Sequence, residues 1–576
     1  MLSQKLQAEV AKVAHEHYQL EAHEVEVSLT RDLAHGDFTT NIALKVASKW
    51  GVPPREASAT ILKALQASVW VGKTFTKCEA AGPGFINFWV RDELWLKSLT
   101  ELMKPAARQA LRGQRVIVEY SSPNIAKPMH IGHIRSTIIG AAIANIYGAM
   151  GAKVVRINHL GDWGTQFGKL IAAYNMWGNR AAVHRHPIEE MLKLYVKFHD
   201  EIKTHPDLER QGQDEFRKLE AGDRKNRALW TWFKRESLRE FNGLYKRLGV
   251  QFAYVTGESF YERMLPGVVA DLLRRKIAVK NSDGSVVVHL TREGLAPCLV
   301  QKSDGASLYA TRDLAAIRYR VQRFKPHDIL YVVANQQTLH FEQVFTVAKL
   351  AGYTMGAHLD HLKFGLVLGE DGQKMATREG RIVKLDDVLD EAVTRARAII
   401  DKKNPKLPAK LKAKVALVVG LGAVKYNDLS QNRHTDITFN WDRMLSLDGN
   451  SAPYLQYSYV RMKSILRKSS GGKPKARLPR LGAGVISEAT PSDHAMLRML
   501  TRYPEQVLRA ARENGPHLLA TYLFDLANAV NSFYESSPVL QASGNVKALR
   551  LHLVASAADV LRDGLRLLGI EVVEQM

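Results

Sequence analysis

Helical and alternating hydrophobic patterns divide the chain into regions of different character. In residues 1–110, Leu6 and Val10 stand at helical spacing, and later segments alternate between apolar and polar positions. A turn signal at residues 82–84 precedes the apolar segment 85–88, which is typical of a strand. This region is predicted to be a small α+β module.

The pattern changes at residue 115. Residues 116–120, VIVEY, form a short apolar run typical of a buried parallel strand. Residues 131–150 follow with isoleucines on one helical face and Gly151 as the stop, and residues 153–158 predict a second strand. Strand, loop, helix and strand in this order predict one βαβ unit of a doubly wound nucleotide-binding sheet.

A charged segment interrupts this sheet. Residues 177–290 are predicted to be helical, with Trp230, Trp232 and Phe233 on one amphipathic stretch. Strand patterns then resume in three segments, residues 308–313, 329–334 and 364–368. The chain is therefore predicted to be α/β, with a Rossmann-type doubly wound parallel sheet that contains a helical insertion.

Apolar helical patterns continue to the C-terminus after a basic, proline-containing linker at residues 401–414. Within them, the basic segment 468–484 is predicted to be a mobile loop. The expected domains are a small α+β domain (1–110), a Rossmann-type α/β domain (111–400) with its insertion at about 177–290, and an all-α domain (401–576).

Composition indicates a class of partner. Lys and Arg exceed Asp and Glu by 23 in 576 residues, which favours a polyanion, either nucleic acid or an anionic membrane. A generally basic bacterial proteome is the alternative explanation. With 46% hydrophobic and 24% charged residues the chain is an ordinary folded protein. No apolar run approaches the ~18 residues of a membrane span.

Two cysteines, Cys78 and Cys298, lie far apart in sequence. They cannot form a cysteine-rich zinc site and suit a reducing compartment. The first 27 residues carry Glu and other polar residues where a signal peptide needs an apolar core. We therefore expect a cytoplasmic protein without zinc, and we expect a monomer.

The clearest chemistry lies in residues 123–133, PNIAKPMHIGH, at the start of the predicted helix. A helix N-terminus at the carboxyl edge of a parallel sheet favours phosphate. Gly132 permits close approach to the backbone, and Lys127, His130 and His133 can donate hydrogen bonds to phosphate oxygens. An isolated pair of histidines would more simply cap the helix, but the position between two strands favours ATP.

Residues 121–140, SSPNIAKPMHIGHIRSTIIG, resemble the HIGH signature of class I aminoacyl-tRNA synthetases in the form found in arginyl-tRNA synthetases. Further similar segments follow in the family's order, at residues 158–168, 308–320, 331–345, 449–461 and 567–576. The resemblance implies ATP- and Mg²⁺-dependent ligation of L-arginine to tRNA(Arg) in translation, through arginyl-adenylate, with release of AMP and pyrophosphate. It also implies that bound tRNA is required for the first step.

The family's second signature would begin at Lys374 and Met375, with Thr377 in place of its second lysine and Arg378 after it. In arginyl-tRNA synthetases a lysine upstream of the first signature supplies the missing charge, and Lys127 matches that position. The alternative for Lys374 is a solvated loop lysine. The resemblance implies catalytic roles for Lys127, His130, His133 and Lys374, and ATP contacts from these four residues together with Gly132 and Met375.

Recognition of a guanidinium in a closed pocket requires carboxylates, because an unpaired buried cation is very costly. The resemblance implies six arginine contacts: Asp313 and Tyr309 at the guanidinium, Glu119 and Asn124 at the α-amino group, and His133 and Gln337 nearby. Structural alternatives exist, since Asp313 could cap a helix and Glu119 could pair with a surface lysine.

RNA contacts are expected from two regions. Tyr454, Tyr457 and Arg461 lie in a part that resembles the family's anticodon-binding domain, where aromatic rings stack on bases and cations hold phosphates. Phe38 and Asn41 lie in a part that resembles the added N-terminal domain, which contacts the tRNA elbow. Core roles are the alternative for these aromatic residues.

Two other functions are compatible with the first signature but fit the rest of the chain less well. A small-molecule adenylyltransferase on the same scaffold needs neither this length nor a basic helical C-terminal region. A synthetase-like RNA-binding protein without catalysis would not need the candidate ATP and arginine residues. Arginine–tRNA ligation is therefore the preferred hypothesis.

Overall fold

The computed structural model describes residues 2–30, 33–104, 108–373, 375, 377–378, 381–469, 471, 481 and 485–576. They form two compact units, each discontinuous in sequence. The first unit contains Met1–Ala110, Ser458–Arg509 and Tyr522–Asp563, and the second contains Leu111–Tyr457, Ala510–Thr521 and Gly564–Met576. Among the described residues, no helix is long and apolar enough to cross a membrane.

The first unit holds a four-stranded antiparallel sheet of order β1-β2-β4-β3. Its strands are β1 (Ser28–Leu29), β2 (Phe38–Thr40), β3 (Phe75–Ala81) and β4 (Phe85–Val90). Gly82 and Gly84, at φ 57° and 152°, form the turn between β3 and β4 that the sequence predicts. The N-terminal helices are α1 (Leu2–Tyr18), α2 (Ile42–Trp50), α3 (Pro54–Ala67), α4 (Val69–Thr74) and α5 (Asp92–Glu101).

C-terminal helices complete the first unit. They are α20 (Pro491–Thr501) and parts of α19 (Ala452–Ser469), α21 (Tyr503–Arg512), α22 (Pro516–Ser536) and α23 (Gly544–Leu567). The buried Asp37 carboxylate accepts the N–H of Val90 at 2.9 Å and pairs with Arg502 at 3.5 Å. Burial raises the pKa of Asp37, against the opposing effects of Val90, Arg498 and Arg502. This contact, between residues 465 positions apart, has no signal in local periodicity.

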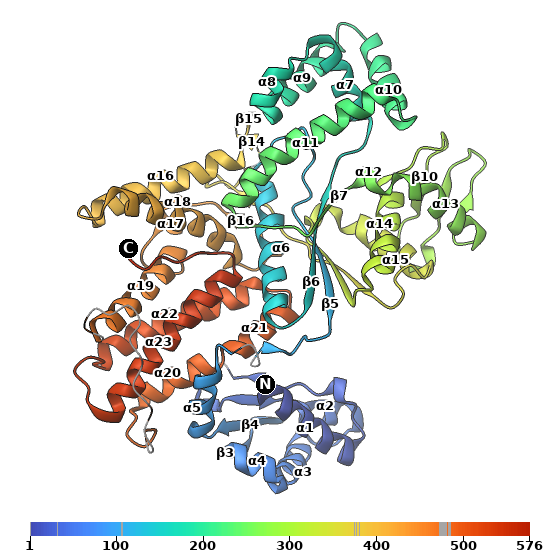
Figure 1. Ribbon diagram of the computed structural model, residues 1–576. Helices are drawn as coiled ribbons and strands as arrows, with labels where there is room; N and C mark the ends of the chain where they lie inside the picture. Colours follow the sequence, from blue (N-terminus) through green and yellow to red (C-terminus); the bar gives the residue numbers. More distant parts are fainter. Residues whose placement is uncertain are drawn as a thin grey trace. The chain divides into compact units, whose positions relative to one another are not determined.

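The second unit is built on five parallel strands of order β12-β11-β5-β6-β7. They are β5 (Arg115–Glu119), β6 (Lys153–Leu160), β7 (Tyr254–Gly257), β11 (Asp328–Tyr331) and β12 (His358–His361). Helix α6 (Ile131–Ala149) connects β5 to β6 and packs on both strands (Figure 1). The predicted βαβ unit and the Rossmann-type sheet are therefore confirmed.

Of the later strand predictions, the one for residues 308–313 is wrong, and the one for residues 364–368 is confirmed only in part. Residues 308–313 begin helix α14 (Tyr309–Phe324), and the N–H of Leu308 donates to Thr311 Oγ1 at its N-terminus, at 3.4 Å. Residues 364–368 contribute β13 (Val367–Leu368), which pairs with β16 (Ile437–Thr438) outside the parallel sheet. Periodicity alone does not distinguish a short strand from a buried helix segment, and β12, at one edge of the parallel sheet, is largely polar.

The expected helical insertion is helical in its first part and then rejoins the sheets. It follows α7 (Thr165–Trp177) with α8 (Arg180–Arg185), α9 (Pro187–Glu201), α10 (Asp207–Glu220) and α11 (Arg224–Arg247), which lie together in Figure 1. Trp232 and Phe233 of α11 are buried, as the amphipathic pattern predicts. The chain continues through β7, α12 (Glu258–Tyr261), α13 (Leu265–Arg274), β8 (Val279–Lys280), β9 (Val286–Val288) and β10 (Cys298–Gln301).

The rest of the second unit is largely helical, with β14 (Thr377–Arg378), β15 (Arg381–Ile382), α15 (Thr338–Leu350), α16 (Leu385–Lys403), α17 (Ala409–Leu429) and α18 (Trp441–Leu445). The predicted linker 401–414 lies mostly inside α16 and α17, which pack against each other. The segment 468–484 lies almost wholly outside the described residues.

Side chains from three helices hold alternate backbone carbonyls of the segment 567–571. Asn145 of α6 donates to the first at 3.1 Å, Lys425 of α17 to the second at 2.6 Å, and Gln456 of α19 to the third at 2.8 Å. Lys425 also donates to the carbonyl of Leu248 at 2.8 Å, and burial lowers its pKa to about 8. This segment therefore joins the helix of the nucleotide-binding unit to α17 and α19.

Arg135 of α6 is fully buried and connects several chain segments. Its Nε donates to the Asp428 carboxylate of α17 at 3.0 Å. Its terminal nitrogens donate to the carbonyls of Thr435 at 3.0 Å and of Leu366 and Arg433 at 3.4 Å. Burial raises the pKa of Asp428, although Arg135 favours its charged form.

Asp428→Ala should lower the free energy of unfolding of the second unit by about 3–5 kcal/mol, because it leaves a buried guanidinium without its counter-charge. The measurement is urea denaturation followed by fluorescence. The matched control is Asp200→Ala, which removes an exposed ion pair with Lys203 at 2.8 Å and should cost no more than about 1 kcal/mol. Equal losses in the two variants would contradict the role assigned to Asp428.

Candidate active site at the carboxyl edge of the parallel sheet

The expected ATP loop lies where the connections of the parallel sheet diverge. From β5 the chain passes through α6 to β6 on one side, and from β11 through α15 to β12 on the other. Ligands of open α/β sheets bind at the carboxyl ends of strands beside such a switch point. A cavity of about 140 Å³ lies here, lined by the start of α6, the loop after β11 and residues 364–367.

The two histidines of the first signature cap helix α6. Nδ1 of His130 accepts the backbone N–H of Gly132 at 3.0 Å, and Nδ1 of His133 accepts the backbone N–H of His130 at 3.2 Å. Because both Nδ1 atoms are acceptors, the proton of each neutral ring stands on Nε2. The capping role considered for the sequence is therefore present, and it orients each Nε2–H as a donor.

His133 is held in the neutral form. Burial lowers its pKa to about 3, with a further contribution from His130, against the opposing effect of the backbone hydrogen bond. The two rings lie 4.0 Å apart between centroids. A pair of neutral imidazoles at a helix N-terminus can donate hydrogen bonds to phosphate without carrying charge of its own.

The loop that leads to these histidines has an unusual backbone. Ser121, Ser122 and Ala126 adopt left-handed conformations, with φ of 75°, 48° and 61°. The N–H of Ser121 donates to Ser136 Oγ at 2.9 Å, and the N–H of Ala126 donates to Ser237 Oγ at 3.0 Å. Helices α6 and α11 thus fix the loop in one conformation.

Lys127 and Asn124 are exposed on this loop. The Lys127 ammonium lies over the Tyr195 ring of α9, 5.5 Å from its centroid. Asn124 forms a parallel bridge with Gly161 in the loop after β6, where a Cβ would lie 1.8 Å from Asn124 Oδ1. A side chain at position 161 would therefore displace the Asn124 amide from this position.

The backbone that follows the second signature runs beside the first signature. Backbone hydrogen bonds of 3.2 and 3.0 Å join residues 129–131 to residues 383–385, and the N–H of Met375 donates to the carbonyl of Val367 at 2.9 Å. Lys374 lies outside the described residues. The backbone that follows the second signature is therefore in contact with the start of α6.

Asp313 and Tyr309 stand on the first turns of α14. The Asp313 carboxylate accepts a hydrogen bond from Nε2 of His340 at 2.6 Å, and both side chains are partly accessible. The Tyr309 ring is 63% exposed, so it is available to a ligand. Gln337 is exposed at the N-cap of α15, before His340.

Glu258 is a candidate that the sequence did not reveal. It begins α12, and its carboxylate lies 3.8 Å from Arg312. Burial raises its pKa to about 7; Arg312 opposes this shift, and Asp313 and Asp162 add to it. The four-residue strand β7 that positions Glu258 lies within the predicted insertion, so neither periodicity nor the quoted motifs indicated the residue.

Glu119 ends β5 and forms an ion pair with Arg320 of α14, with both residues buried. Its observed partner is thus a buried arginine and not a surface lysine. Arg320 also contacts Nδ1 of His159 at 3.2 Å. A carboxylate has about four acceptor positions, so Glu119 can keep this pair while accepting from a further donor.

The expected RNA contacts Tyr454, Tyr457 and Arg461 lie on helix α19 and differ in accessibility. On α19, Tyr457 is 46% exposed and Tyr454 is partly buried. Further along α19, the Arg461 guanidinium lies over the Tyr534 ring, 4.5 Å from its centroid, and donates to Asn531 at 3.3 Å. Tyr534 is itself 41% exposed and was not identified from the sequence.

The N-terminal candidates lie closer to the core. Phe38 is 1% exposed and its ring packs on Trp95, with centroids 6.4 Å apart. Asn41 stands at the N-cap of α2, partly buried. Phe38 therefore occupies the core position that the sequence left as an alternative. Among the described residues, no group of three or more His, Cys, Asp or Glu side chains is placed to hold a metal ion.

The cap geometry predicts the behaviour of His133 in solution. Nitrogen-15 NMR of histidine-labelled protein should show the Nε2–H tautomer for His133, without titration between pH 5 and 8, because its pKa is lowered to about 3. Loss of the resonance in His133→Gln assigns it. A ring that titrates in this interval would contradict the geometry.

Three family models match the chain. They describe the N-terminal domain of arginyl-tRNA synthetases (residues 1–90), the class I (R) tRNA synthetase catalytic domain (98–441) and the DALR anticodon-binding domain (455–576). Together they confirm the three-domain architecture expected from the sequence.

Similar proteins include arginine–tRNA ligase of Fusobacterium nucleatum, 39% identical over 96% of this chain and 95% of that protein, and arginine–tRNA ligase 2 of Bacillus anthracis, 42% identical over 87% and 88%. The arginyl-tRNA synthetase structure from Thermus thermophilus is 26% identical, with a TM-score of 0.84 and full coverage of both chains. The Plasmodium falciparum structure is 25% identical, with a TM-score of 0.83 over 100% and 99%. The chain belongs to the arginyl-tRNA synthetase family, a class I group that uses ATP to ligate arginine to tRNA(Arg) in translation.

Proposed function

We propose that the site at the carboxyl edge of the parallel sheet performs both steps of this ligation. In the first step the arginine carboxylate attacks the α-phosphate of ATP, forming arginyl-adenylate and expelling pyrophosphate. In the second step the terminal ribose hydroxyl of tRNA attacks the activated carbonyl, and AMP leaves. Each step needs alignment and charge stabilisation and no protein nucleophile.

The guanidinium of arginine is proposed to bind between Asp313 and Tyr309, with Glu258 on the same side. The observation that carries this assignment is the pair of carboxylates, Asp313 and Glu258, at one edge of the sheet. Burial raises the pKa of Glu258 to about 7, and repulsion from the nearby Asp313 carboxylate adds to this rise. A bound guanidinium offers planar donors to carboxylates and relieves that repulsion.

The other end of the substrate is assigned to residues at the ends of β5 and β11. Glu119 and Asn124 would accept from the α-amino group, with His133 and Gln337 nearby. Glu119 already pairs with Arg320, so it would be shared between the two cations. The fixed loop between residues 121 and 126 supports this assignment, because it orients Asn124 before arginine binds.

ATP is assigned to the start of α6. His130 and His133 would donate from Nε2 to phosphate oxygens, and Gly132 allows the phosphates to approach the backbone. Lys127 and Lys374 would supply positive charge to the α-phosphate and the leaving pyrophosphate, with Met375 beside the nucleotide. The cavity beside His130, Gly132 and Arg135 supports this placement.

Mg²⁺ is proposed to enter with ATP. Mg²⁺ retains several waters and is held largely by substrate phosphates. This fits the described residues, which offer no dedicated cage of carboxylates, histidines or cysteines. When bound, the ion would neutralise charge on the phosphate oxygens.

Roles in tRNA binding are assigned to Tyr454, Tyr457 and Arg461, with Tyr534 added because it stacks on Arg461. Asn41 keeps its predicted contact with the tRNA elbow, and the core position of Phe38 would limit it to supporting that surface. The domain limits at 110 and 400, a monomeric state and a cytoplasmic location remain predictions.

Asp313→Asn should raise the KM for arginine about 100-fold in tRNA-dependent pyrophosphate exchange, because it removes one charge from a desolvated ion pair. The KM for ATP should change little. The control is Asp304→Asn, on an exposed loop before α14, which should leave both constants unchanged. The role of Asp313 would be excluded by unaltered arginine kinetics. The proposed function itself would be contradicted if the unmodified enzyme catalysed pyrophosphate exchange with an amino acid other than arginine. It would also be contradicted if the enzyme catalysed no exchange with arginine in the presence of cognate tRNA.

Arginine binding should also depend on the ionisation of Glu258. Its pKa is raised to about 7 by burial, so the carboxylate is protonated, and unable to pair with a guanidinium, at lower pH. We expect kcat/KM for arginine to fall by about tenfold per pH unit below this value and to level off above it. Glu258→Gln should abolish this fall in kcat/KM at low pH. The control Glu342→Gln, at an exposed position on α15, should retain it. If the fall in kcat/KM at low pH persists in Glu258→Gln, the titration belongs to another group.

A further inference from the structure

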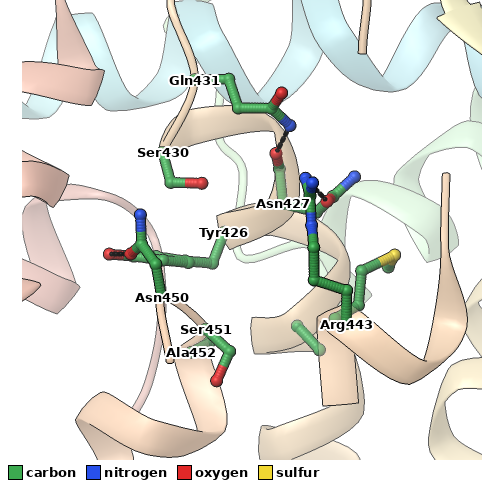
Figure 2. Close-up of a pocket in the computed structure, with 10 residues that line it drawn as sticks. Tyr426, Asn427, Ser430, Gln431, Arg443, Asn450, Ser451 and Ala452 are labelled. Carbon is green, nitrogen blue, oxygen red and sulfur yellow. Dashed lines mark hydrogen bonds between the residues drawn. The ribbon is translucent and has the colours of Figure 1, made fainter. Parts of the chain in front are cut away.

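A second cavity, of about 280 Å³, lies at the C-terminal end of helix α17. Its walls come from the last turns of α17, from α18 and from the start of α19 with the loop before it. Figure 2 shows Gln431 and Arg443 around this space, with Ser430 and Asn450 on another side. None of its lining residues belongs to the ATP or arginine site.

Hydrogen bonds hold the polar groups of this cavity in place. Nη2 of Arg443 donates to Oδ1 of Asn427 at 3.3 Å, and Nε2 of Gln431 donates to the Asn427 carbonyl at 2.6 Å. The Tyr426 hydroxyl donates to Oδ1 of Asn450 at 2.7 Å. These bonds orient Oε1 of Gln431 as an acceptor and Nδ2 of Asn450 as a donor (Figure 2). Polar groups fixed in this way lose little freedom when a ligand binds.

The lining has a definite chemical preference. It contains no carboxylate, so it does not suit a cation such as arginine. Arg443, which is exposed, suits a phosphate. The amides offer the donor and acceptor pairs that match the edges of unpaired bases. Ala423, Met444 and Ala452 supply apolar surface for the faces of a base.

We propose that this cavity binds one unpaired nucleotide of the RNA substrate, with its base inside and its phosphate against Arg443. The volume of about 280 Å³ lies just below the usual range for ligand pockets, about 300–1,000 Å³, which suits one base with its sugar. Tyr457 is exposed on α19, the helix that begins at Ala452 of the cavity wall. Its ring offers a surface on which a neighbouring base can stack. The inference rests on the proposed function, which supplies the RNA.

A neighbouring contact makes the wall rigid. Asn427 faces the cavity, whereas the next residue of α17, Asp428, pairs with the buried Arg135 of α6. Rotation of the end of α17 would therefore break a buried ion pair. The cavity is thus a fixed part of the second unit and not the product of a mobile side chain.

Arg443→Gln tests the phosphate contact. The dissociation constant for tRNA(Arg), measured by filter binding, should rise about tenfold, and the slope of its logarithm against log salt should fall by about one. The matched control is Lys402→Gln, an equal charge change at the exposed end of α16, which should have a much smaller effect. The KM values for arginine and ATP at saturating tRNA should remain those of the unmodified enzyme.

Asn450→Asp provides an independent arm. It keeps the acceptor for the Tyr426 hydroxyl but replaces the amide donor by a negative charge, and should also weaken tRNA binding about tenfold. The side chains of Arg443 and Asn450 are both exposed, so neither substitution should change the thermal unfolding midpoint. Binding of AMP is measured in parallel, because a free mononucleotide shares the same chemistry.

Weaker tRNA binding by both variants, with unchanged AMP binding, would support the proposal. Loss of an AMP site with unchanged tRNA affinity would assign the cavity to free nucleotide and overturn it. If the two variants keep the affinity of the unmodified enzyme for tRNA and for AMP, the proposal is also overturned. These results are distinct from failure of the proposed function, in which the unmodified enzyme would not charge tRNA with arginine.

Discussion

A guanidinium buried away from water must be surrounded by acceptors, and Arg135 is the point where this requirement organises the second unit. It stands on the same helix as His130 and His133, so the segments that satisfy it also fix that helix. Asp428 binds it from α17, and carbonyls bind it from the strand that leads to the second signature and from the turn before β16. The alignment of helix α6 with the rest of the candidate site thus follows from one buried charge.

Around this helix the candidate site separates two electrostatic environments. Neutral imidazole donors and helix N–H groups face the proposed position of ATP, where His133 stays uncharged because it is buried beside His130. The carboxylates of Asp313 and Glu258 gather on α14 and α12, towards the proposed position of the guanidinium. Each environment is unfavourable for the other substrate. This arrangement orients an arginine whose carboxylate must meet the α-phosphate.

Local patterns predicted the elements whose partners are near in sequence. The unit from β5 to β6 follows from two apolar runs and one amphipathic helix, and the glycine turn between β3 and β4 from its residue types. The prediction failed at residues 308–313, which begin helix α14 and are too few to show a helical period. It also gave no sign of the His340 hydrogen bond to Asp313, of Glu258 at the end of β7, or of the pair between Asp37 and Arg502. Those contacts depend on pairing across the fold, which periodicity does not encode.

The capture of residues 567–571 by Asn145, Lys425 and Gln456 has a consequence for biosynthesis. Until these residues have left the ribosome, each of the three side chains lacks the backbone carbonyl to which it donates in the folded protein. The first unit has the same property, because its N-terminal sheet packs on helices that are translated far later. A nascent chain cannot therefore complete either unit in the order of synthesis, which is the usual route for large proteins. The enzyme that serves translation therefore reaches its own folded state only after residues 567–571 have left the ribosome.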